Sequence, residues 1–169
     1  ISFGIGGLGA IAGAVHLAAH ALIKSALFYG AGSIAARFKT TKIASVTDVT
    51  RAMPKTGTLF LIVIFMLLAA PPSPLFLSEY LLVFVGLGIY PMLIALILLA
   101  LTIVAAGFIR QFAPLLFVRD EEGARAGEAW SVSHGAIIAH YALVVLIGIL
   151  LWTPGGYAIA EHIAGAFSK

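Results

Sequence analysis

The 169-residue sequence contains no cysteine and has few charged residues. Without thiols, the chain cannot form disulfides, bind a metal through thiolates or ligate an iron–sulfur cluster. Asp, Glu, Lys and Arg make up 10% of the residues, whereas soluble domains carry about 25%. Because 62% of the residues are hydrophobic, a water-soluble fold of this size would lack the polar side chains needed to cover its surface. These scarcities predict an integral membrane protein.

The apolar runs predict an all-α, polytopic membrane bundle. Each run approaches or exceeds the roughly 20 residues that cross the hydrocarbon core as a helix. Pro71, Pro72 and Pro74 interrupt the second run, and three missing backbone donors must break that helix within the membrane. We expect a single membrane domain with about four spans, the second of them broken at 71–74, and a short interfacial helix at 157–168. The spans are expected at about 9–36, 57–88, 92–118 and 134–152.

The excess of basic residues is concentrated in one polar loop, residues 37–55, in which Asp48 is the sole acid. The positive-inside rule places this loop on the cytoplasmic side, and an even number of crossings places residues 119–133 there too. The predicted location is the inner or plasma membrane of the cell, with lipid as the solvent. Topology therefore explains the net charge of +3, and no nucleic-acid partner is expected.

Three ionisable residues recur at steps of four in the first span: His16, His20 and Lys24. Each step advances about 40° around a helix, so the side chains form one stripe about 12 Å long. Histidine titrates near neutral pH, and a desolvated lysine can exchange protons there, so the stripe suits a proton relay. The alternative is structural: hydrogen bonds to neighbouring helices, with Lys24 extending to the interface. The histidine spacing also suits two metal ligands, but no third ligand is evident and no metal is expected.

Glu79 is the second candidate, because it is the one acid in a long apolar stretch and follows the proline break. Broken helices leave unpaired backbone groups that transporters use to build ion sites at membrane depth. A carboxyl beside such a break could load and release a proton. Alternatively, Glu79 lies near the outer interface and is simply solvated.

Four further polar residues in the spans are secondary candidates. Ser25 and Tyr29 extend the polar line of the first span, and His140 lies in the fourth span, where a core hydrogen bond is an alternative role. Arg110 lies towards the end of the third span, where its side chain can reach the interface.

The segment HLAAHALIKSALFYGAGSIA resembles a signature of the antiporter-like subunits of respiratory complex I, the Mrp cation/proton antiporters and the energy-converting hydrogenases. LAAPPSPLFLSEYLLV is similar to the Pro-broken helix of that family. ISFGIGGLGA and GFIRQFAPLLF are most similar to the branch of hydrogenase-4 component F and the formate hydrogenlyase membrane subunit. The resemblance covers nearly the whole chain.

The resemblance implies a fourteen-helix fold with two inverted repeats, of which this chain would supply the C-terminal part. Since the chain begins at Ile1 in an apolar stretch, we expect an N-terminal portion that is not included in this sequence, is cleaved or is a separate chain. Carried over by position, His16, His20 and Lys24 match the central hydrophilic axis, and Glu79 matches the terminal proton site.

The function implied is that of a non-catalytic, proton-translocating subunit of a redox complex such as NADH-quinone oxidoreductase or a membrane-bound hydrogenase. No cofactor is expected in this chain, so iron–sulfur, NiFe or flavin centres would belong to partner subunits. The expected partners are other membrane subunits of that complex, including the N-terminal half of the same fold. The alternatives are an Mrp-type sodium/proton antiporter and a purely structural membrane subunit.

Overall fold

In the computed structural model, the chain is a bundle of helices, described for residues 1–118, 128–151 and 153–166. No strand occurs in those ranges, which confirms the all-helical fold class. The elements in chain order are α1 Ser2–Ile5, α2 Leu8–Phe38, the 3-10 turn η1 Ile43–Ser45, α3 Val49–Ala52, α4 Pro54–Leu67, α5 Pro74–Ile89, α6 Pro91–Phe117, α7 Val132–Leu151 and α8 Pro154–Ala166.

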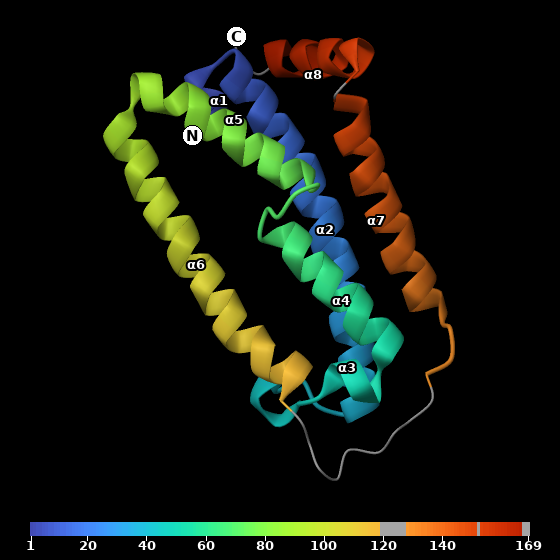
Figure 1. Cartoon of the computed structure of the whole chain (residues 1–169). Helices are drawn as coiled ribbons and strands as arrows, with labels where there is room; N and C mark the ends of the chain where they lie inside the picture. The colour runs from blue at the N-terminus through green and yellow to red at the C-terminus, as the bar shows by residue number, and fades with distance from the viewer. Residues whose placement is uncertain (119–127, 152, 167–169) are drawn as a thin grey trace.

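Helix α2 is the centre of the bundle. Helices α4, α5 and α7 pack along it, and α1 and α8 pack against it as well (Figure 1). Its buried face is rich in small and branched residues, among them Ala19, Ile23 and Ala26, which form one core with Val63 of α4 and Val144 of α7. Small residues on α2 allow its neighbours to approach closely, as in other membrane bundles.

Three of the helices, α2, α6 and α7, are long and apolar enough to cross a membrane. Helices α4 and α5 have 14 and 16 residues, and each alone is shorter than the roughly 20 residues that a crossing needs. They follow each other in the middle of the bundle and are separated by a short non-helical link (Figure 1). The expected broken helix is therefore confirmed as two half-helices.

The break is stabilised by Ser73. Its hydroxyl donates to the carbonyl oxygen of Met66 at 3.0 Å and accepts the amide of Leu75 at 3.2 Å. The side chain thus caps α5 by accepting an amide that a helix start leaves without a partner, and it adds a second bond to the Met66 carbonyl, which also accepts the Ala69 amide at 3.1 Å. The link spans residues 68–73, whereas the sequence predicted 71–74, because Pro74 occupies the favourable first position of α5.

Helix α6 stands to one side of the bundle (Figure 1). At its start, Ile94 is buried against Gly86 of α5. At its end, Leu115 and Leu116 are buried, and the Leu116 carbonyl accepts a hydrogen bond from the Thr50 hydroxyl at 2.7 Å. Between these contacts its side chains are mostly exposed, since only 6% of its most apolar stretch is buried within the chain.

Three helices begin two or three residues earlier than expected. Helix α4 begins at Pro54 rather than 57, and α8 begins at Pro154 rather than 157, because proline is well suited to the first turn of a helix. Helix α7 begins at Val132 rather than 134. Residues 119–127 of the second predicted loop, and residues 152, 167 and 168, lie outside the described ranges. The single-domain organisation and the cytoplasmic side of the loops stay predictions.

Candidate functional site

Ser78 joins the two regions that the sequence singled out. His16 Nδ1 of α2 lies 3.1 Å from Ser78 Oγ of α5. The Ser78 hydroxyl donates its hydrogen to the Leu75 carbonyl at 2.8 Å, so His16 Nδ1–H donates to Ser78. This bond connects the predicted relay helix to the half-helix that follows the proline break.

His16 and His20 lie side by side on α2, as their spacing predicted. Their rings are stacked with centroids 5.6 Å apart and planes 17° from parallel. Both are half-buried, whereas Lys24, one turn further, is exposed within this chain. Lys24 is 14 residues before the end of α2 at Phe38, which places it about 21 Å from that end, in the middle of the helix. Its central position does not favour the alternative in which its amine simply reaches the interface.

Glu79 follows Ser78 on α5 and is half-buried. It lies within about two turns of the proline break, and it is the residue after Ser78, which His16 contacts. In the described part of the chain, no basic side chain lies within ion-pair distance of its carboxylate. The carboxyl is available to bind and release a proton without first breaking an ion pair.

In the part of the chain that the structure describes, the four secondary candidates make their contacts away from His16 and Ser78. The Ser25 hydroxyl donates to the Ala21 carbonyl of its own helix at 3.0 Å. Tyr29 and His140 meet, with ring centroids 5.7 Å apart, and His140 Nδ1 bonds to the Ala136 carbonyl at 2.8 Å. Arg110 is exposed on α6, the helix that stands apart. Thus the structure unites Tyr29 with His140 but connects neither Ser25 nor Arg110 to the His16–Ser78 contact.

A second polar cluster lies where α7 begins and was not predicted. Glu128 caps α4: its Oε2 accepts the amides of Lys55 at 2.6 Å and Thr56 at 3.1 Å, and its Oε1 accepts the Thr56 hydroxyl. The carboxylate satisfies the first free amides of α4 and opposes the positive end of its dipole. Glu128 thereby fixes the start of the half-helix that leads into the break.

His134 of α7 completes this cluster and is buried. His134 Nδ1 accepts the Ser131 amide at 2.9 Å, so Nε2 carries the hydrogen and donates to Glu128 Oε1 at 3.0 Å. The Trp130 ring packs edge-on against His134, and Lys55 Nζ lies 4.7 Å from the Trp130 ring centre. The contacts hold α7 against the start of α4.

The Glu128 carboxyl is held in its charged form. Burial alone would raise its pKa, but the hydrogen bonds from Thr56, His134 and the Lys55 amide outweigh burial and hold the pKa below its ordinary value. A lowered pKa in the folded state means that the carboxylate stabilises the fold fully above the ordinary value of 4.5. This contribution is lost as the pH falls through the lower pKa of the folded state.

We expect Glu128→Ala to lower the free energy of unfolding by about 2 to 3 kcal/mol, because it leaves buried donors of α4 and His134 without an acceptor. Thermal unfolding of the full-length protein in detergent at pH 7 measures this loss. Glu128→Gln keeps an acceptor oxygen but removes the charge, so it should lose less. The difference between wild type and Glu128→Gln should shrink below pH 4.5. An unchanged midpoint for Glu128→Ala would contradict the capping role.

The sequence carried only weak signals for these additional residues. The signal for Ser78 is that a polar residue stands directly before Glu79, in LSEY, within an otherwise apolar segment. Thr56 and Glu128 are separated by 72 residues, and no local pattern connects them. The cluster depends on the path of the chain between α6 and α7.

Comparison with known proteins shows a match to a family over the part of the chain that contains His16, Lys24 and Glu79. The family described as NADH:quinone oxidoreductase/Mrp antiporter, transmembrane region, matches residues 1–105. A hydrogenase-4 component F homologue from Methylacidiphilum infernorum (isolate V4) is 28% identical over 153 residues, which cover 89% of this chain. The chain spans 31% of the length of that relative.

Proposed function

Because this chain belongs to the NADH:quinone oxidoreductase/Mrp antiporter family of membrane proteins, we propose that it moves protons as part of a redox-driven membrane complex. The observation that carries the proposal is the His16–Ser78 hydrogen bond at 3.1 Å. It brings the ionisable stripe of α2 against the half-helix that holds Glu79. Ionisable groups within membrane spans are costly and mark proton or ion routes by default.

In the proposed mechanism, Glu79 and the stripe of α2 exchange protons in turn. A proton on Glu79 removes a negative charge, and a proton leaving Lys24 removes a positive one. In a low-dielectric interior, each change alters the electrostatic energy of the other group. His20 and His16 follow Lys24 along the stripe of α2, and His16 contacts Ser78, the residue before Glu79 on α5. The break keeps backbone polar groups beside Glu79, where water can enter.

This chain would contribute the proton-carrying groups and no redox centre. Electron transfer would take place in partner subunits that carry iron–sulfur, NiFe or flavin centres. The relative from Methylacidiphilum infernorum is a hydrogenase-4 component F homologue, which favours a hydrogenase as the redox partner. The membrane is proposed to be the inner or plasma membrane, with the loop at 37–55 in the cytoplasm.

Inside-out membrane vesicles that contain the full-length protein in its complex test this function. With a pH-sensitive dye inside, addition of dihydrogen or NADH should acidify the interior in sodium-free buffer, and a protonophore should abolish the change. Acidification that needs a sodium gradient but no electron donor would instead favour the sodium/proton antiporter of the same family. Electron transfer with no acidification in either condition would contradict proton movement and favour a structural subunit.

A further inference from the structure

The Ser78 hydroxyl has two partners and one hydrogen. Its oxygen lies 2.8 Å from the Leu75 carbonyl oxygen and 3.1 Å from His16 Nδ1. If the hydrogen pointed to His16, two oxygen atoms with lone pairs would face each other at 2.8 Å with no hydrogen between them. Both contacts are favourable only when Ser78 donates to Leu75 and His16 Nδ1 carries a hydrogen that it donates to Ser78.

Leu75 is held in place by the start of α5. Its amide donates to the Ser73 hydroxyl at 3.2 Å, and its carbonyl accepts the Ser78 hydroxyl. Ser73, Leu75 and Ser78 are all buried, so bulk water does not compete for these bonds. The direction of the Ser78 hydroxyl therefore follows from the first turn of α5, directly after the proline break.

The bond to Ser78 determines which nitrogen of His16 is basic. The tautomer of a neutral histidine is set by the hydrogen bonds of its ring. With the hydrogen on Nδ1, the lone pair is on Nε2, which has no hydrogen-bond partner among the residues that the structure describes. The His20 ring stacks beside His16 without a hydrogen bond to it. Nε2 is therefore the atom of His16 that takes up a proton.

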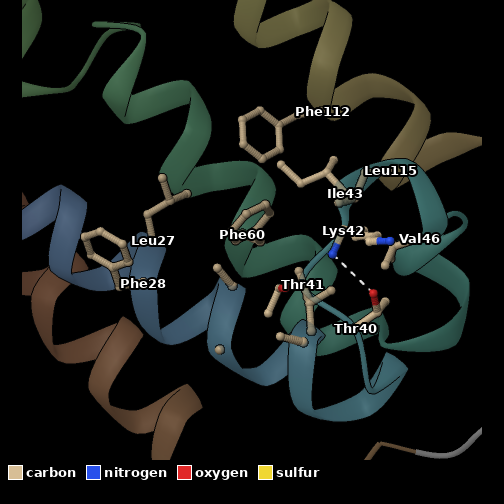
Figure 2. A pocket seen from close by; sticks show the side chains of 14 residues that line it. Leu27, Phe28, Thr40, Thr41, Lys42, Ile43, Val46, Phe60, Phe112 and Leu115 are labelled. Atoms are coloured by element: carbon tan, nitrogen blue, oxygen red, sulfur yellow. Dashed lines mark hydrogen bonds between the residues drawn. The ribbon is translucent and has the colours of Figure 1, made fainter.

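The apolar groove at the loop end of the bundle offers His16 no further partner. Phe60 and Phe112 face this groove, and its lining on α2 begins at Leu27 (Figure 2). Leu27 follows His16 by 11 residues, which is about 16 Å along the helix. Within the described ranges, the Ser78 contact alone fixes the hydrogen positions of His16.

A proton that enters His16 at Nε2 must also leave from Nε2. A histidine that passes protons onward receives them at one nitrogen and releases them from the other. Here Nδ1–H faces Ser78, whose own hydrogen is held by the Leu75 carbonyl. This chain of hydrogen bonds ends at a carbonyl, which has no hydrogen to pass on. The contact with α5 thus positions His16 but does not conduct protons.

We propose that Ser78 is a positioning residue that makes His16 a proton store, loaded and unloaded at Nε2. This inference rests on the proposed function, because the stored proton is one that the complex moves. Uptake converts the neutral ring to an imidazolium with Nδ1–H still bonded to Ser78, and release returns the proton from Nε2. The stored charge lies beside the residue that precedes Glu79.

Solid-state ¹⁵N NMR of the histidine-labelled, full-length protein in membranes measures which ring nitrogen carries the hydrogen. Spectra are taken at about pH 8.5, two units above the ordinary histidine pKa, so that neutral rings dominate. His140, which donates Nδ1–H to a carbonyl, and His134, which accepts at Nδ1, are internal references for the two tautomers. The His16 signals, assigned by their loss in His16→Gln, should match those of His140.

Ser78→Ala removes one oxygen from a buried position and adds no atom, so it should fold. The excess of the Nδ1–H tautomer of His16 should fall about fivefold, which is the bias that one hydrogen bond typically supplies. Ser33→Ala is the matched control, since that hydroxyl donates to the Tyr29 carbonyl of its own helix at 3.0 Å and bonds to no histidine. Wild-type His16 with its hydrogen on Nε2 would overturn the proposal, as would an unchanged tautomer in Ser78→Ala.

Proton movement gives the second measurement. A ring that releases protons from either nitrogen no longer retains the stored proton, so Ser78→Ala should lower the ratio of protons moved to electrons transferred about fivefold. Ser33→Ala should keep the wild-type ratio. Absence of acidification in wild type would contradict the proposed function, while the NMR spectra would still test the position of the hydrogen. Normal acidification in wild type with the same ratio in Ser78→Ala would overturn the store.

Discussion

Lys24→Ala is expected to reduce redox-driven proton translocation about tenfold or more while electron transfer in the complex continues. Lys24 is the one basic residue in the middle of α2, about 21 Å from the end of the helix, and it follows the stacked His16–His20 pair by one turn. Removing its amine removes both a proton carrier and the positive charge that acts on its neighbours. The measurement is the initial rate of acidification in inside-out vesicles, divided by the rate of electron transfer.

Two further variants separate proton exchange from charge. Lys24→Arg keeps a positive charge that does not deprotonate in proteins, so we expect it to fail almost as completely as alanine. Full activity in Lys24→Arg would show that Lys24 acts only as a fixed charge. Arg37→Ala removes a basic residue from the exposed last turn of the same helix and should translocate protons like wild type. Normal translocation in Lys24→Ala would contradict the relay.

Glu79→Gln is expected to cause a loss of similar size. The amide keeps the shape and hydrogen-bonding oxygen of the carboxyl but cannot bind and release a proton at neutral pH. Because Glu79 has no ion-pair partner in the described ranges, the substitution should leave the fold intact. The ratio of protons moved to electrons transferred should fall about tenfold or more, with an unchanged thermal midpoint.

Glu161→Gln is the matched control for this prediction. Glu161 is exposed on α8, so the same chemical change there should leave translocation unaffected. A purely structural subunit predicts instead that Glu79→Gln and Glu161→Gln behave alike, with the pH dependence of wild type. Equal proton-to-electron ratios in these two variants would therefore contradict the role of Glu79.

Much of the helical architecture could be predicted from the sequence, because each span is a long apolar run and each proline constrains the backbone locally. Pro71 and Pro72 indicated the break, although Pro74 proved to start α5 rather than to lie within the link. The position of α6 could not be predicted in this way. From Pro91 to Ile109 the one polar side chain is that of Thr102, so the sequence indicates a membrane helix but not which neighbours it contacts.

The candidate site was predictable only where it lies on one helix. His16 and His20 are four residues apart, and helix geometry alone places their rings side by side. The His16–Ser78 bond and the capping of α4 by Glu128 join residues 62 and 73 positions apart, respectively. Such contacts depend on how the helices pack, which a pattern along the chain does not specify. The roles of His16, His20, Lys24 and Glu79 in proton movement stay predictions.

The most direct measurement is infrared difference spectroscopy of the Glu79 carboxyl during turnover of the complex, with Glu79→Gln used to assign its C=O band. If ionisable groups on α2 and α5 exchange protons, the band should appear or disappear when electron transfer starts in wild type. It should remain constant in Lys24→Ala. A Glu79 carboxyl that keeps one protonation state throughout turnover in wild type would contradict the account.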